Sequence, residues 1–276
     1  MSKTKKVTAK ITSRSAVKKN IFVTLNKWNI AMAGLHALQG ILILVFSKGV
    51  TFPVTINHLT TDSLASQAAG HTVLAPATQH LFDINVAYLV AAFFFLSAIA
   101  HVVIATVYRQ SYEKDLKQGI NKARWIEYGL SASTMIVAIG LISGIYDLGS
   151  LKMLFALTLV MNLLGLVMEV HNQATKKTNW LSFIVGCVAG IVPWGVIAMT
   201  LWAASVYGSG QIPSFVYWIY ASMFVFFSSF AVNMFLQYKK KGRWADYLYG
   251  ERVYMVLSLV AKSVLAWQVF FGSLRP

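Results

Sequence analysis

The sequence has little charge and almost no cysteine. Only 12% of its 276 residues are Asp, Glu, Lys or Arg, about half the share of a soluble domain, whereas 57% are apolar. So few charges cannot cover the surface of a soluble fold of this size. The single cysteine, Cys187, excludes an intramolecular disulfide and any cysteine metal cluster. We therefore expect an all-α integral membrane protein and predict no metal site.

Acidic residues are especially scarce. The chain has nine Asp and Glu against 24 Lys and Arg, which gives a net charge of +15. Such a charge is also typical of nucleic-acid binding proteins, but here the basic residues form short blocks between apolar runs. We interpret these blocks as cytoplasmic loops that face anionic membrane lipid, and we predict no nucleic-acid partner.

Seven apolar stretches are each long enough to cross a bilayer as a helix, which takes roughly 20 residues. They lie near residues 28–48, 85–108, 122–146, 151–171, 180–206, 214–237 and 251–273. We predict a seven-transmembrane-helix bundle in the cell membrane, spanning residues 28–273 and preceded by a basic cytoplasmic tail over residues 1–27. The charged tail is too long for the start of a cleaved signal peptide, so the first span is expected to be an anchor.

The positions of Lys and Arg predict the orientation, because cytoplasmic loops carry an excess of these residues. Twenty of the 24 lie in the N-terminal tail, in the second, fourth and sixth connections, or at the start of the last span. Lys48, Lys152 and Arg275 lie on the opposite side, and Lys262 lies within a span. We therefore predict a cytoplasmic N-terminus and an extracellular C-terminus.

The first outer connection, residues 49–84, is long and nearly uncharged. Residues 50–52 and 71–74 alternate between apolar and polar side chains, which is typical of strands. The pattern is compatible with a short external hairpin and equally with an irregular loop.

Lys262 is the residue of greatest functional interest. It lies ten residues after Arg252, which places it roughly 15 Å along the last helix and near the bilayer centre. A charged lysine at that depth is costly, so a functional role is expected. Three roles compete: an anchor for a covalent cofactor or ligand, a structural partner of a carboxylate, or a residue lining an ion path. The first suits lysine because burial favours the neutral amine, which condenses with aldehydes.

Glu127 is the acid best placed to meet Lys262, because the other acids fall in loops or at span ends. It follows Arg124 by three residues, so the two share a helix face, and an interfacial ion pair is the competing interpretation. The third and seventh spans both start at the cytoplasm, and helical side chains lean toward the N-terminus. The stem of Lys262 therefore reaches toward Glu127. Ser258, one turn before Lys262, adds a hydroxyl on the same face.

Further polar residues lie inside the first two spans. His36 and Gln39 share one face of the first span, and Ser97 and His101 share one face of the second. Histidine within a membrane helix usually faces the bundle interior. These residues are therefore expected to form either a polar cluster with Glu127 or separate structural hydrogen bonds.

Aromatic residues mark the fifth and sixth spans. Pro193 in the fifth predicts a kink, with the Trp194 ring beside it. The sixth span carries Tyr217, Trp218, Tyr220, Phe224, Phe226, Phe227 and Phe230. We interpret these rings either as bundle core or as one wall of a slot for a flat ligand.

The sequence resembles the microbial rhodopsins in three features. It has seven spans, a lysine in the middle of the last one and Arg-x-x-acid at the start of the third. The sequence is most similar to the heliorhodopsin family within that group. The segments that carry the similarity are Leu96–His101, Arg124–Tyr128, Gly186–Trp194, Gly250–Tyr254 and Ser258–Gln268. The orientation predicted from charge, with the N-terminus inside, is also the arrangement of heliorhodopsins.

The resemblance implies a set of roles for the candidate residues. Lys262 would bind all-trans retinal as a protonated Schiff base, with Glu127 as the single counter-ion. Ser258 occupies the position at which proton pumps carry a second carboxylate. Tyr128 and Trp194 would contact the chromophore.

The resemblance also implies features around the chromophore and at the surface. His36, Gln39, Ser97 and His101 match a polar cavity on the cytoplasmic side of the Schiff base, and Glu169 matches a membrane-embedded family position. The family is dimeric, with the first outer loop forming a short sheet at the interface. It is regarded as light-sensing, with isomerisation of retinal to 13-cis and a slow photocycle, and a cytoplasmic signalling partner is left open.

The sequence argues against a proton pump. The outer halves of the third and seventh spans, beyond Leu130 and Lys262, contain no carboxylate. A proton released from the Schiff base is therefore expected to stay on the cytoplasmic side and return. We predict a photoreceptor rather than an enzyme. The alternatives are a light-gated or light-driven ion conductor, and a retinal-free transporter that binds its substrate with Lys262 and Glu127.

Overall fold

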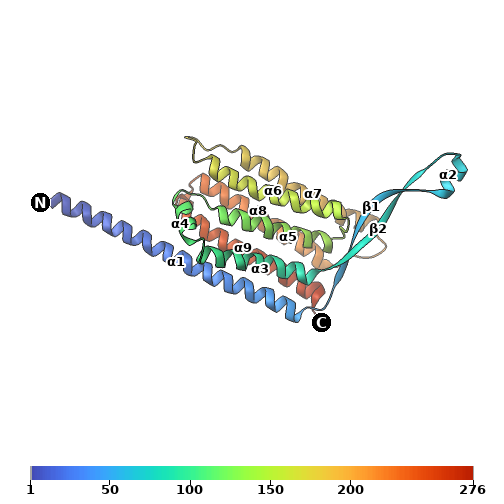
Figure 1. Ribbon diagram of the computed structural model, residues 1–276, viewed down its shortest axis with the longest axis horizontal. Coiled ribbons are helices and arrows are strands. Elements are labelled where there is room, and N and C mark those ends of the chain that lie inside the picture. The colour runs from blue at the N-terminus through green and yellow to red at the C-terminus, as the bar shows by residue number, and fades with distance from the viewer. Residues whose placement is uncertain (1, 276) are drawn as a thin grey trace.

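The computed structural model describes the backbone of residues 2–275 and the side chains of residues 21–275. A bundle of long helices carries a two-stranded hairpin that projects from one end (Figure 1). Of the basic tail predicted over residues 1–27, the side chains of residues 1–20 lie outside the described residues.

The long helices of the described chain are α1 (Ser2–Phe46), α3 (Val86–Ala105), α5 (Lys122–Ile142), α6 (Leu148–His171), α7 (Leu181–Tyr207), α8 (Ser214–Tyr238) and α9 (Tyr247–Val269), the last continued by the π-helical turn η2 (Phe270–Leu274). Each contains a segment long and apolar enough to cross a membrane, which confirms the prediction of seven spans. Helix α1 runs through the first predicted span, and its Phe22 and Leu25 are buried in one cluster with Tyr112 and Leu116 of α4 (Arg109–Lys117).

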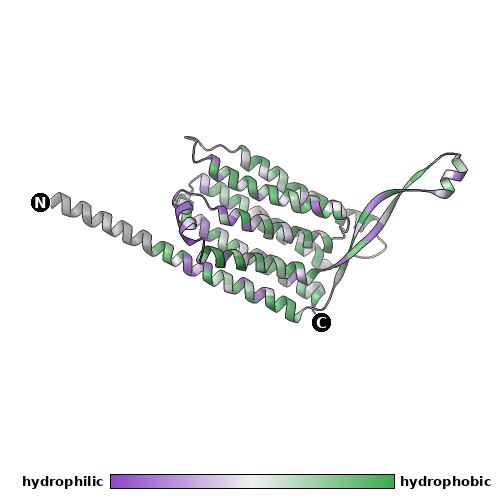
Figure 2. Cartoon of the chain, viewed as in Figure 1, coloured by the Kyte–Doolittle hydropathy of each residue, from purple (hydrophilic) through white to green (hydrophobic). Residues whose placement is uncertain are grey.

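The helices pack in sequence around a central α5. Helix α1 lies against α3, α3 against α5, α5 against α6 and α6 against α7, and α8 pairs with α9. Helix α9 also contacts α1 and α3, which closes the bundle. The main core is apolar and includes the fully buried Phe93, Phe94, Ile136, Ile139 and Leu265. The bundle is mostly hydrophobic, whereas the connections and much of the hairpin are more hydrophilic (Figure 2).

The first outer connection folds as a hairpin, which settles the choice between hairpin and irregular loop. Strands β1 (Thr51–Thr61) and β2 (Leu74–Asn85) pair antiparallel along their whole length, with a bulge between Val54 and Thr55. The short helix α2 (Ser63–Ala69) joins them at the tip. The hairpin is longer than the two alternating stretches, because the pairing runs from Thr51 to Thr61 on one strand and from Leu74 to Asn85 on the other.

The base of the hairpin is anchored to the connection between α5 and α6. The Thr55 amide donates to the Tyr146 carbonyl at 2.9 Å, and the Asn57 amide donates to the Asp147 carboxylate at 3.4 Å. Asp147 is also the N-cap of α6 and accepts from the Ser150 amide at 2.8 Å. The hydrogen bonds from Ser150 hold the pKa of Asp147 below its usual value. This carboxylate therefore joins the hairpin to the bundle.

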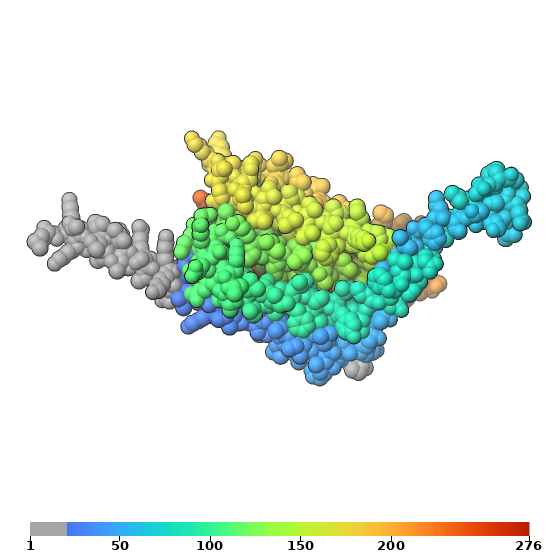
Figure 3. Space-filling model, viewed as in Figure 1, coloured from blue at the N-terminus to red at the C-terminus, as the bar shows by residue number. Residues whose placement is uncertain are grey.

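The other end of the bundle carries a short helix, α4 (Arg109–Lys117), and the 3-10 turn η1 (Gly242–Ala245). Asp115, predicted to be a loop residue, is instead buried in α4, where it accepts from the Tyr108 hydroxyl and from Lys122, both at 3.2 Å. This part of the molecule, here called the α4 end, lies opposite the hairpin end (Figure 3).

Candidate functional site

Lys262 and Glu127 meet inside the bundle. Lys262, on α9, donates to the Glu127 carboxylate on α5 at 3.2 Å and to the Ser258 hydroxyl, one turn earlier on its own helix, at 2.7 Å. Both charged residues are buried, with exposures of 3% and 7%. The Lys262 ammonium also lies 5.3 Å from the centre of the Tyr128 ring. The lean of helical side chains toward the N-terminus thus gives the Lys262 stem the reach that this contact needs.

Polar residues of α1 and α3 extend this group away from Lys262. The Ser97 hydroxyl donates to the Glu127 carboxylate at 2.6 Å. His101, one turn further along α3, bonds through Nδ1 to the side-chain oxygen of Asn29 at 2.8 Å. The rings of His36 and His101 stack with their centres 5.8 Å apart, and neither buried nitrogen of His36 has a hydrogen-bond partner among the described residues. The polar residues beside the Lys262–Glu127 pair are thus Asn29, His36, Ser97 and His101.

Gln39 contacts a different part of the bundle. Its side-chain oxygen accepts from the Trp267 indole at 3.3 Å, one turn beyond Lys262 toward the hairpin end. Asn29, which the sequence analysis did not single out, instead holds His101. Asn29 lies on the same helix face as His36, seven residues away, and this spacing is the signal that could have identified it.

Tyr128 and Trp194 lie on the walls of the interior. The Tyr128 hydroxyl donates to the Tyr254 carbonyl at 2.8 Å, which ties α5 to α9. Trp194 packs edge-on against Tyr220, Phe224 and Phe227, with ring centres 5.3–5.7 Å apart. These contacts fill the space between α7 and α8 with rings.

The aromatic wall predicted on α8 includes two residues that face outward. Tyr217 and Trp218 are 43% and 68% exposed. Trp218 lies on the helix face opposite the rings that contact Trp194, whereas Tyr217 lies near the start of α8. The inward face carries Tyr220, Phe224, Phe227 and Phe230, all of which pack against the main core.

Two adjoining cavities extend from Lys262 into the bundle. The nearer one has a volume of about 40 Å³ and is bordered by Lys262, Ser258 and Tyr128. The farther one, about 230 Å³, lies between α6, α7 and α8 and is bordered by Trp194 and Gly190. The walls shared by the two cavities are Met161, Asn162, Phe227 and Phe230.

The walls of the farther cavity are shaped by close packing at glycines. A Cβ on Gly190 would lie 2.3 Å from the Met161 sulfur, and one on Gly165 would lie 2.4 Å from the Trp125 ring. These glycines therefore let bulky side chains approach the neighbouring helix. A lysine amine beside a long, mostly apolar space with aromatic walls fits a long apolar aldehyde bound to Lys262.

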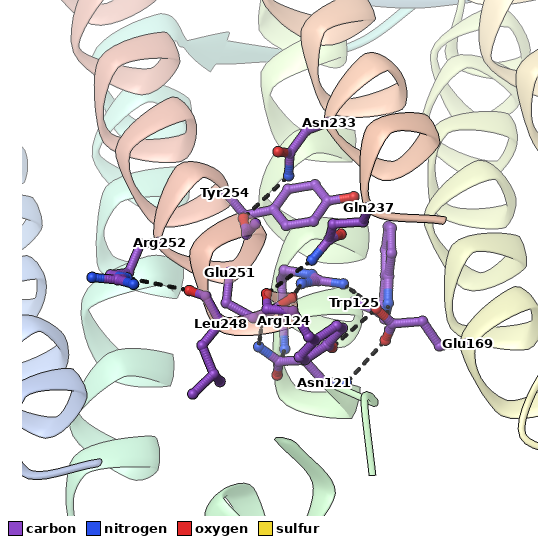
Figure 4. Close-up of polar contacts among 12 residues, drawn as sticks. Asn121, Arg124, Trp125, Glu169, Asn233, Gln237, Leu248, Glu251, Arg252 and Tyr254 are labelled. Carbon is purple, nitrogen blue, oxygen red and sulfur yellow. Dashed lines mark hydrogen bonds and ion pairs between the residues drawn. The ribbon is translucent and has the colours of Figure 1, made fainter. Parts of the chain in front are cut away.

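A second buried charge cluster lies toward the α4 end. Arg124 forms ion pairs with Glu169 of α6, at 2.6 Å, and with Glu251 of α9 (Figure 4). Its guanidinium also lies 4.0 Å from the Tyr254 ring centre and 4.5 Å from that of Trp125. All three charged groups are at least 95% buried.

Further hydrogen bonds reach both of these carboxylates. Asn121, the N-cap of α5, donates from its backbone amide to Glu169 at 2.9 Å and from its side chain to Glu251 at 2.6 Å. The Trp125 indole and the Tyr247 hydroxyl also donate to Glu169, at 2.7 and 3.1 Å. One cation thus faces two acids in a closed polar cluster, which joins α5, α6 and α9.

This cluster bears on two interpretations drawn from the sequence. Arg124 pairs with the acids of α6 and α9, so the competing interpretation of an ion pair between Arg124 and Glu127 is wrong. Glu169 and Glu251 lie at span ends as predicted, but each is only 1% exposed. Local spacing gives no signal for this arrangement, because the partners lie 45 and 127 residues from Arg124.

A small cavity of about 20 Å³ lies between the two charge clusters, bordered by His101, Arg124, Glu127 and Glu251. This is enough room for about one water molecule with several polar partners. The two clusters are therefore neighbours along α5 rather than independent sites.

Comparison with known proteins identifies the family. The heliorhodopsin family model matches residues 25–274. A search of curated proteins found no match. Among solved structures, the light-driven proton pump LR (Mac) from Leptosphaeria maculans aligns with a TM-score of 0.60 and 14% identity, covering 89% of this chain and 94% of that one. At this identity the similarity shows a shared fold alone. Because the family model covers nearly the whole chain, the protein belongs to the heliorhodopsin family and is a multi-pass membrane photoreceptor of the retinal type.

Proposed function

We propose that the protein senses light through all-trans retinal held on Lys262 as a protonated Schiff base, with Glu127 as the counter-ion. The observation that carries the proposal is the 3.2 Å contact between the Lys262 nitrogen and the Glu127 carboxylate. An ion pair this deep in a membrane protein is costly and marks a functional site. Retinal supplies the absorption of light and the change from the all-trans to the 13-cis form.

The chain's own residues fix the charge and exclude water around Lys262. Ser258 accepts from the nitrogen at 2.7 Å and adds no charge, so Glu127 alone balances the cation. Ser97 donates to the same carboxylate oxygen and holds its orientation. Tyr128, Trp194 and the inward rings of α8 border the space that the polyene would occupy.

The polar residues beyond Glu127 include groups that accept a proton. Glu127 is the carboxylate that contacts the Lys262 nitrogen, at 3.2 Å, and is the first group that would take up its proton. An amide oxygen only accepts hydrogen bonds, so the His101 Nδ1 that faces Asn29 carries a hydrogen and Nε2 is left to accept a proton. His36, stacked on His101, provides two further nitrogens. Gln39, through its bond to Trp267, supports α9 beyond Lys262.

We propose that this proton returns to the Schiff base without net transport. The outer halves of α5 and α9, beyond Leu130 and Lys262, carry no acid that could release a proton at the hairpin end. The α4 end faces the cytoplasm in this proposal, because the Lys and Arg residues concentrate at that end.

The hairpin supports a proposal of homodimerisation. Leu59, Leu81 and Phe82 are exposed on its strands, and exposed apolar side chains on a two-stranded ribbon favour pairing with a second copy. The long spans contact membrane lipid, and the basic α4 end is available to a cytoplasmic signalling partner.

Illumination of vesicles that contain the protein tests the absence of transport. We expect no sustained pH change and no photocurrent under voltage clamp. A steady pH change that a protonophore abolishes would show pumping, and a photocurrent that follows the gradient of another ion would show a conductor.

A further inference from the structure

A polar cavity lies at the α4 end, away from the Lys262 site. It has a volume of about 370 Å³ and lies among the connections from α4 to α5, from α6 to α7 and from α8 to α9. Its wall includes Gln118, Gln173, Thr175, Lys176, Gln237 and Lys240. Amide, hydroxyl and ammonium groups from separate connections thus converge on one space.

The charge of this cavity is positive. None of its wall residues is acidic. Lys176 and Lys240 form no ion pair with any residue that the structure describes at this end of the bundle. Further basic residues flank them in the same connections, namely Lys177, Lys239, Lys241 and Arg243. Two lysines without an ion-pair partner, on the wall of a cavity without acids, favour the binding of an anion.

The backbone conformation of Lys240 is unusual for a lysine. Lys240 has φ of +49°, and no other non-glycine residue in the range 2–275 has a positive φ. It follows the C-cap of α8, where glycine is preferred because this conformation is strained for other residues. Glycine would fit this turn with less strain but would remove the ammonium from the cavity wall. Such strain is commonly found at functional sites.

The inner wall of the cavity is held rigidly and adjoins the Arg124 cluster. Gln237 donates to the Tyr247 carbonyl at 3.2 Å, and Gln173 donates to the Glu169 carbonyl at 3.1 Å. Tyr247, itself a wall residue, donates its hydroxyl to the Glu169 carboxylate. Figure 4 shows Gln237 beside the Arg124 cluster. The cavity is therefore preorganised, and its occupant would lie one side chain away from the buried acids.

We propose that this cavity binds a phosphate group between Lys176 and Lys240. Two lysines match the charge of a phosphate dianion, and lysine binds phosphate well as a point charge. Gln173 and Gln237 each use one amide N–H within the wall and keep a second, which supplies an uncharged hydrogen-bond donor. The phosphate belongs either to a small soluble anion or to a phospholipid headgroup at the membrane surface.

Titration calorimetry on the full-length, retinal-bound protein in nanodiscs of uncharged lipid tests this proposal, with pyrophosphate as the probe and acetate as the comparison anion. We expect saturable binding of one pyrophosphate and much weaker binding of acetate. Replacing one lysine removes a charged hydrogen-bond partner, so Lys176→Ala and Lys240→Gly should each weaken binding about tenfold. Lys177→Ala, the matched control beside Lys176 but outside the cavity wall, should leave the affinity unchanged.

The Lys240→Gly variant separates binding from folding. Because glycine suits the positive φ, its thermal midpoint should equal or exceed that of the parent while its affinity falls. Weaker pyrophosphate binding in nanodiscs that contain phosphatidylglycerol would assign the site to a lipid headgroup, and unchanged binding would assign it to a soluble anion. The proposal is overturned if no saturable binding occurs, if acetate binds as well as pyrophosphate, or if Lys177→Ala weakens binding as much as Lys176→Ala.

Discussion

Replacing Arg124 by glutamine should destabilise the protein strongly. The guanidinium faces Glu169 and Glu251 in a region where all three residues are at least 95% buried, so the substitution leaves two acids without their cation. Breaking a buried ion pair in this way costs about 3–5 kcal/mol. At roughly 2–4 °C per kcal/mol, the midpoint of thermal unfolding should fall by about 6–20 °C.

The loss of the visible absorption band on heating is a suitable assay, because it reports the integrity of the bundle around the chromophore. Arg109→Gln is the matched control: Arg109 pairs with Glu113 at 3.0 Å, but on the surface, where such pairs contribute less than about 1 kcal/mol. Adding Glu169→Gln and Glu251→Gln to Arg124→Gln should raise the thermal midpoint part of the way back to that of the parent, because the unpaired negative charges are removed. Equal midpoints for Arg124→Gln and Arg109→Gln would refute this account of the cluster.

Three further predictions concern the counter-ion and the hairpin. Glu127→Gln should shift the visible band strongly to the red, because the cationic nitrogen loses its charge partner; an unchanged spectrum would show that Glu127 is not the counter-ion. Ser97→Ala should give a smaller shift than Glu127→Gln, since the carboxylate keeps its charge and loses only a 2.6 Å hydrogen bond; a shift as large as that of Glu127→Gln would contradict this. The lowered pKa of Asp147 means that its contribution to stability is present above the ordinary aspartate pKa and is lost as the pH falls through the lowered value. The parent protein should therefore be more stable than Asp147→Asn in chemical denaturation at pH 7, with the difference shrinking toward pH 3, and a difference independent of pH would exclude this role.

The membrane-spanning architecture could be predicted from the sequence because it follows from composition and length. Runs of about 20 apolar residues have few alternatives to a membrane helix. The register of the hairpin depends on pairing between residues up to 34 positions apart, which alternation over a few residues does not reveal.

The candidate site was predictable where one residue is chemically exceptional. Lys262 stands out because an ionisable group at that depth needs a partner, and Glu127 was the acid that could reach it. The residues alone did not predict the burial of Glu169 and Glu251, since residues at the ends of spans are usually solvated, and only the family resemblance indicated an embedded position for Glu169. Their burial depends on how α6 and α9 pack against Arg124, and this information lies in tertiary contacts.

The most direct test of the central claim is the absorption spectrum of the purified protein with and without added all-trans retinal, measured beside Lys262→Ala. The structure predicts a visible band in the parent protein and none in the variant, because Lys262 is the amine that borders the apolar cavity. The same visible band in folded Lys262→Ala, or no band in the folded parent after addition of retinal, would contradict the assignment of Lys262 as the chromophore's attachment site.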